Sequence, residues 1–139
     1  MRAAKTFLIF IAAMASALLI VLLPQRLAFD EGESYTFFCG DTSADCRIIT
    51  VDKNASLYKL ALKDVCGEST LYPSLDVQSF LQKVNGEIIF TEELSDSVNY
   101  YCKADLEYSV ALYGEQINLH ICVKQQGVTV ASPIIFGGY

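Results

Sequence analysis

Residues 72–87, YPSLDVQSFLQKVNGE, contain the clearest helical pattern in this chain of 139 residues. Their apolar side chains recur with the spacing of one side of a helix, at Val77, Phe80, Leu81 and Val84. Ser74 is a suitable N-cap, and Asn85 and Gly86 are typical of a helix end. We therefore expect an amphipathic helix over residues 75–84, with its apolar side packed on another layer.

Segments rich in β-branched and aromatic residues lie on both sides of this helix. Two precede it, at 34–40 and 46–52. Five follow it, separated by short turn-prone sequences: 87–93, 97–104, 108–114, 116–125 and 127–135. Residues 54–69 fit a helix and a strand equally well, and we favour a strand. The pattern predicts an α+β domain in which one helix packs on one face of a single, mostly antiparallel sheet.

The N-terminal region contains an apolar run at residues 6–23, TFLIFIAAMASALLIVLL, which carries no charge. As a helix, its eighteen residues span about 27 Å, enough for the hydrocarbon core of a bilayer. The run is longer than the apolar core of a signal peptide, and no A-x-A cleavage site follows it. It is therefore interpreted as an uncleaved membrane anchor, with a cleaved secretion signal as the alternative.

Basic residues predict the orientation of this anchor. Arg2 and Lys5 precede the run and only Arg26 follows it closely, which places the N-terminus in the cytoplasm and the rest outside. The chain then divides into three parts: the anchor with its cytoplasmic tip at 1–23, a juxtamembrane tether at 24–34, and an extracytoplasmic domain at 35–139.

Charge and composition exclude several classes of function. From Leu27 onward the chain has seven basic and sixteen acidic residues, a net charge of −9. Such a domain repels nucleic acids, so no nucleic-acid partner is expected. There is one histidine and no C-x-x-C pattern, so neither a metal nor another cofactor is predicted.

The five cysteines are compatible with disulfides in an oxidising compartment. Cys39 and Cys46 bracket a short polar loop between two expected strands, and we predict that they form a bridge. Cys102 and Cys122 are a possible second disulfide if their strands are neighbours. Cys66 is then the odd thiol.

The single histidine lies in an alternating strand. The apolar residues of this strand share one face, at Ile117, Leu119, Ile121 and Val123. The other face of the sheet is expected to carry polar and aromatic side chains from this strand and from residues 97–104. We predict that they form a recognition surface for a protein or peptide: Asn99, Tyr101, Asn118 and His120. The alternative is an enzyme, a small thiol hydrolase or redox-active protein that uses Cys122 with His120 as its base.

The C-terminal half also resembles a known family. The strand with Asn118, Leu119, Ile121 and Val123, followed by Ser132-Pro133-Ile134-Ile135 and a terminal Tyr139, is similar to the C-terminal part of YwmB-like proteins. These are sporulation-associated proteins with a TATA-box-binding-like fold. The resemblance covers about residues 75–139 and implies a fold and a sporulation or cell-envelope setting, but no catalytic residues. Together, these observations predict a membrane-anchored, non-enzymatic binding or structural module.

Overall fold

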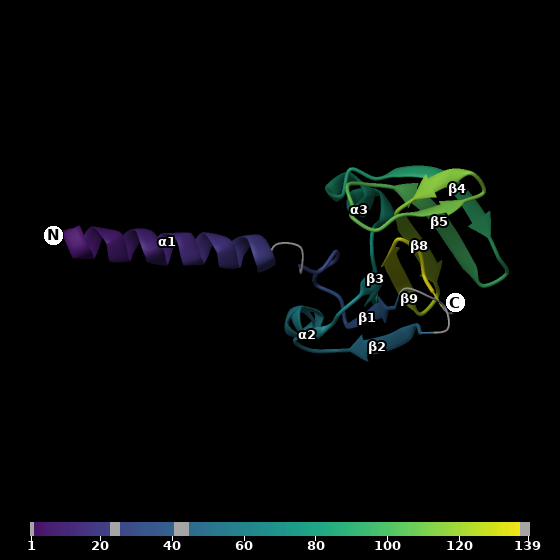
Figure 1. The fold of residues 1–139 in the computed structure, drawn as a ribbon. Coiled ribbons are helices and arrows are strands. Elements are labelled where there is room, and N and C mark those ends of the chain that lie inside the picture. Colours follow the sequence, from purple (N-terminus) through teal and green to yellow (C-terminus); the bar gives the residue numbers. More distant parts are fainter. Residues whose placement is uncertain (1, 23–25, 41–44, 137–139) are drawn as a thin grey trace.

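The computed structural model describes residues 2–22, 26–40 and 45–136 (Figure 1). The elements are α1 (Arg2–Leu22), β1 (Ser34–Cys39), β2 (Arg47–Val51), α2 (Ala55–Ala61), β3 (Val65–Tyr72), α3 (Val77–Lys83), β4 (Glu87–Glu93), β5 (Ser97–Lys103), β6 (Val110–Leu112), β7 (Glu115–Ile117), β8 (Leu119–Lys124) and β9 (Gly127–Ser132). Seven strands form one antiparallel sheet in the order β2-β1-β3-β9-β8-β5-β4, and β6 and β7 form a separate hairpin. The predicted α+β class is confirmed.

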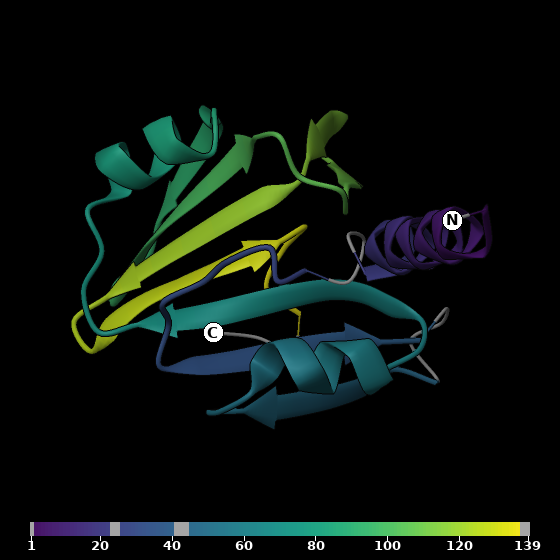
Figure 2. The same ribbon diagram turned by 90° about the vertical axis from the view of Figure 1, so that its left-hand side faces the viewer.

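The sheet joins an N-terminal and a C-terminal set of strands. Hairpins account for β1–β2, β4–β5 and β8–β9, while β3 pairs with β1 on one side and β9 on the other. Both α2 and α3 lie on one side of this sheet, which we call the helix face (Figure 2). The opposite side is called the second face.

Helix α3 confirms the helix expected at 75–84, with shorter limits. Its N-cap is Asp76 rather than Ser74, because the Asp76 carboxylate accepts a hydrogen bond from the backbone N–H of Ser79 at 2.7 Å. The helix ends where Asn85 adopts the left-handed conformation with φ of 50°. Phe80 is buried against the sheet, as the apolar spacing predicts.

Helix α2 replaces the strand favoured at the start of residues 54–69. Asn54, with φ of 56°, precedes it, and only Ala55 and Lys59 on the helix are buried. Strand β3 begins later, at Val65. The apolar alternation that suggested a strand is misleading here, because the helix turns a lysine toward the sheet and leucines away from it.

Residues 26–33, part of the expected tether, pack on the helix face instead. Phe29 is buried, and its ring centroid lies 5.9 Å from that of Phe80. The Tyr72 hydroxyl donates to the carbonyl of Asp30 at 2.6 Å. This segment fills the space between α2 and α3, so the domain begins before residue 35.

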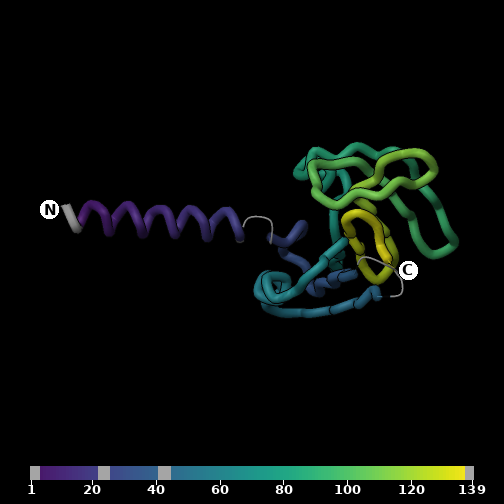
Figure 3. Tube along the Cα trace, viewed as in Figure 1, coloured from purple at the N-terminus to yellow at the C-terminus, as the bar shows by residue number. Residues whose placement is uncertain are grey.

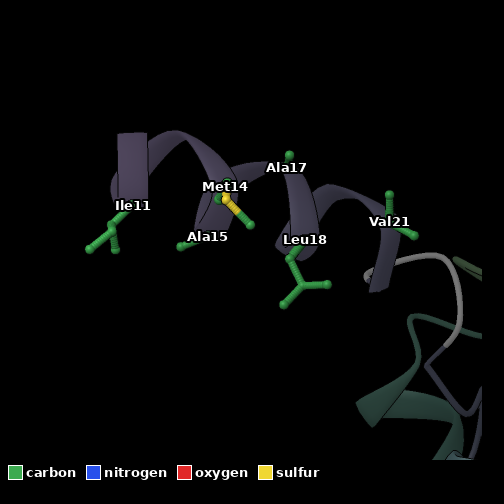
Figure 4. A pocket seen from close by; sticks show the side chains of 6 residues that line it. All are labelled: Ile11, Met14, Ala15, Ala17, Leu18 and Val21. Carbon is green, nitrogen blue, oxygen red and sulfur yellow. The ribbon is translucent and has the colours of Figure 1, made fainter. Parts of the chain in front are cut away.

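Helix α1 extends away from the domain as a single helix (Figures 1 and 3). Its apolar stretch Ala4–Val21 is long enough to cross a membrane, and none of it is buried. Figure 4 shows six of these side chains projecting from α1: Ile11, Met14, Ala15, Ala17, Leu18 and Val21. The shallow hollow between them is the surface of one isolated helix and has almost no polar lining.

None of the five cysteines forms a disulfide in this structure, so the predicted Cys39–Cys46 bridge is absent from it. Cys39 is buried toward α2 and lies opposite Arg47 in the β1–β2 ladder, while Cys46 is exposed before β2 begins. Cys102 points to the helix face and Cys122 to the second face. The suggested Cys102–Cys122 bridge is therefore ruled out by side-chain parity, because the sheet separates the two thiols.

Candidate functional site

The second face of the sheet carries the residues that the sequence singled out. Paired strands place Phe90, Tyr101 and His120 side by side on β4, β5 and β8. The Phe90 and Tyr101 ring centroids are 4.5 Å apart, and those of Tyr101 and His120 are 4.4 Å apart, both pairs nearly parallel. The row continues through Ala131 and Ser69, so its side chains are aromatic at one end and small at the other.

The C-terminal segment at residues 133–136 crosses this face after β9, and we call it the strap. The backbone N–H of Ile135 donates to His120 Nδ1 at 3.2 Å. The Phe136 ring packs edge-on against Phe38 of β1, with centroids 5.0 Å apart. Gly67 leaves room for the strap, since a Cβ there would lie 3.0 Å from the Phe136 ring.

His120 is held between the strap and the sheet. Its Nε2 lies 3.1 Å from Asn99 Oδ1, and its Nδ1 accepts the Ile135 N–H, so the proton of the neutral ring is on Nε2. Burial lowers the pKa of His120 to about 4. The imidazole is therefore neutral near pH 7 and serves as a hydrogen-bonding link inside the domain.

The four residues of the expected recognition surface are all buried in this structure. Asn99, Tyr101 and His120 meet on the second face as their alternation predicts. Asn118 lies apart from them. Its side-chain Oδ1 accepts a hydrogen bond from the Ala104 N–H at 2.7 Å, and its Nδ2 donates to the Ala104 carbonyl at 2.6 Å, so Asn118 fixes the β5–β6 connection. The strap covers His120, so this part of the face is an interior.

Cys122 lacks the surroundings of an activated thiol. Burial, the largest effect, raises its pKa, although Lys124 and a hydrogen bond with Ser97 act in the opposite direction. The two nitrogens of His120 are directed to Asn99 and Ile135, so the imidazole does not serve Cys122 as a base. This geometry supports a structural thiol and gives no support to the hydrolase alternative.

A groove of about 320 Å³ opens on the second face beside the strap. Its lining comes from five strands and the strap: Thr36, Phe38, Ile48, Thr50, Ser69, Cys122, Lys124, Thr129, Ile135 and Phe136. Hydroxyl groups line part of the groove, with Thr36 Oγ1 and Thr50 Oγ1 3.0 Å apart. Aromatic and aliphatic groups line the rest, and Lys124 supplies a single positive charge. The groove therefore suits a small ligand, or part of a larger one, that has both apolar and polar groups.

Sequence reasoning missed the strap and the groove beside it. Alternation placed the second-face residues of β8 correctly, but the pairing of β1 and β2 with the C-terminal strands through β3 is a tertiary feature. No protein-family model matches this chain, and comparisons with curated proteins and with solved structures find no match either.

Proposed function

We propose that this chain is a membrane-anchored module outside the cytoplasm whose groove on the second face binds an extended peptide. The groove carries this proposal, because it is a concave site with mixed lining that is bounded by strand β2 at the edge of the sheet. An edge strand offers backbone donors and acceptors to an added strand. A peptide paired with β2 would place alternate side chains next to Ile48 and Thr50.

The anchor rests on α1. Its eighteen-residue apolar stretch is entirely exposed in the folded chain, and lipid is the environment in which such a surface is stable. Arg2 and Lys5 before the stretch support an N-terminus in the cytoplasm. The resemblance of residues 75–139 to YwmB-like proteins adds a sporulation or cell-envelope setting to the proposal but does not identify the ligand.

Peptide binding is tested by panning a random peptide library against the full chain in nanodiscs. Enriched peptides should slow hydrogen exchange of the β2 amides and should lose binding to Thr129→Trp, which fills the groove. Thr91→Trp, at an exposed position of strand β4, is the matched control and should bind normally. If no peptide is enriched, or if Thr129→Trp binds as well as the control while both remain folded, the peptide proposal is wrong.

The orientation is tested with a membrane-impermeant maleimide on intact cells. Tyr113→Cys in the exposed β6–β7 turn supplies the target, in a background where exposed Cys46 and Cys66 are replaced by serine. We expect labelling without cell lysis. Labelling that appears only after lysis would place the domain in the cytoplasm.

A further inference from the structure

Helix α2 turns its apolar side outward. Leu57, Tyr58 and Leu60 are 65%, 51% and 42% exposed, and we call these three residues the α2 stripe. The side that faces the sheet contains Ala55 and Lys59 instead. This arrangement is the reverse of an ordinary surface helix, whose apolar side packs on the core. An exposed cluster of large apolar side chains usually marks a contact surface.

A buried ion pair fixes this orientation. The Lys59 ammonium lies 2.6 Å from the Glu68 carboxylate on β3, and the two side chains are only 4% and 3% exposed. The ammonium also lies 5.7 Å from the centre of the Tyr108 ring. Rotating α2 to bury its leucines would pull Lys59 away and leave Glu68 as an isolated charge in the interior, which is costly. The outward direction of the α2 stripe is thus a stable feature of the fold.

The same lysine connects α2 to the residues that leave the anchor. Lys59 Nζ donates to the carbonyl of Arg26 at 2.5 Å, and the Glu68 carboxylate accepts the N–H of Ala28. Helix α1 ends at Leu22. Four residue steps span at most about 14 Å, so Arg26 must lie within that distance of the end of α1. Figures 1 and 2 show α2 on the side of the sheet from which α1 leaves.

The charge around α2 also differs from that of the domain. Exposed Lys53 and Lys63 flank the helix in the sequence, and exposed Asp52 and Asp64 lie next to them, so the four charged residues at its two ends have no net charge. The domain as a whole carries −9 from Leu27 onward. Repulsion from anionic lipid headgroups is therefore weaker at α2 than the net charge of the domain suggests.

We infer that the α2 stripe lies in the interfacial region of the same bilayer that α1 enters. Leucine side chains reach the boundary of the acyl chains, and Tyr58 has the amphipathic ring that is favoured at headgroup level. The contact holds the domain at a defined orientation on the membrane, with the helix face toward the lipid. This inference rests on the proposed anchor, so the two need separate readouts.

The chain contains no tryptophan, which allows single-tryptophan variants of the full-length protein. The variants Leu57→Trp, Leu94→Trp and Ile11→Trp are reconstituted in two sets of vesicles of phosphatidylcholine and phosphatidylglycerol, one with bromine near the headgroup end of the acyl chains for Leu57→Trp and Leu94→Trp, and one with bromine near the bilayer centre for Ile11→Trp. Leu94 is the matched control, since it is 45% exposed in the β4–β5 turn, on the side of the domain away from α1 (Figure 1). Ile11 reports on α1 itself.

We expect the emission of Leu57→Trp to be blue-shifted and to lose intensity with brominated lipid, while Leu94→Trp keeps both its wavelength and its intensity. If Ile11→Trp is quenched but Leu57→Trp behaves like Leu94→Trp, α1 is in the bilayer and the inference about α2 is wrong. A blue shift of Leu57→Trp without quenching by bromine also overturns it, because a protein surface or a second copy then covers the stripe. If Ile11→Trp is not quenched, the anchor fails and the inference fails with it.

Discussion

Replacing Lys59 by methionine should destabilise the domain strongly. Methionine keeps an unbranched chain of similar length, so the main change is the loss of an ammonium that lies 2.6 Å from the Glu68 carboxylate. Glu68 then stays buried with the N–H of Ala28 as its remaining strong donor. Breaking a buried pair in this way costs about 3–5 kcal/mol, a large part of the roughly 5–15 kcal/mol that stabilises an ordinary domain.

The double variant Lys59→Met with Glu68→Met separates the cost of an isolated charge from the value of the pair. Two apolar side chains of similar volume should restore stability to within about 1–2 kcal/mol of the parent protein, because removing both charges also removes the desolvation penalty. The two single variants and the double variant form a double-mutant cycle, so the coupling between the residues is obtained directly.

Urea unfolding of the full chain in mild detergent measures these differences. Far-ultraviolet circular dichroism follows the sheet, while α1 stays helical in the micelle and adds a constant signal. If Lys59→Met lowers the free energy of unfolding by less than about 1 kcal/mol, the ion pair behaves like an exposed one. That result would refute the burial of Lys59 between α2 and the sheet. The inward position of Lys59 would then be wrong, and with it the physical reason for the exposed stripe.

Three further predictions concern the two faces of the sheet. Phe80→Ala should cost about 3–5 kcal/mol in urea unfolding because the ring is buried on the helix face, and a change below about 0.5 kcal/mol would contradict this packing. Burial lowers the pKa of His120 to about 4, so the neutral imidazole stabilises the folded state fully above about pH 6.5, and this stabilisation is lost as pH falls toward 4. The free energy of unfolding should fall by up to about 3 kcal/mol over this range, and this fall should be absent in His120→Gln. If the unfolding free energy depends on pH in the same way in both proteins, the buried neutral histidine is excluded. Gly67→Val should displace the strap and cost about 1–3 kcal/mol, with faster hydrogen exchange of the Ile135 amide; unchanged exchange would show that the strap does not cross Gly67.

Periodic features of the sequence predicted those parts of the structure that depend on a single element. The spacing around Phe80 identified α3, and the alternation around His120 identified which side chains of β8 face the core. Alternation within one strand does not fix how neighbouring strands align, so it left Cys102 and Cys122 as a possible disulfide. The pairing of β5 with β8 aligns Tyr101 with His120 and puts the two thiols on opposite faces.

The features that were missed depend on partners far away in the sequence. An apolar stripe on α2 looks like an ordinary core-facing helix or a strand, and only the Glu68 carboxylate explains why Lys59 faces inward. Polar residues near Asp30 suggested a tether, but Phe29 finds its contact on α3, about fifty residues later. The exposure of the second face was also misjudged, because the strap that covers His120 follows the last strand and has no periodicity of its own.

The two faces of the sheet place the attachment of α1 and the groove on opposite sides of the domain. The segment that follows α1 packs on the helix face, with Leu27 on the cluster that contains Ala55 of α2 and Phe29 on the cluster that contains Phe80 of α3, and it cannot reach the second face without unfolding that core. The groove is built from second-face side chains such as Phe38 and Thr129, so its opening is directed away from the side from which α1 leaves the domain. A contact between the α2 stripe and lipid would therefore leave the groove accessible, and a ligand bound beside β2 would not need to displace the domain from the bilayer. Membrane attachment and ligand binding would on this account be independent, because the first uses α1 and the α2 stripe, whereas the second uses strand side chains that point to the second face.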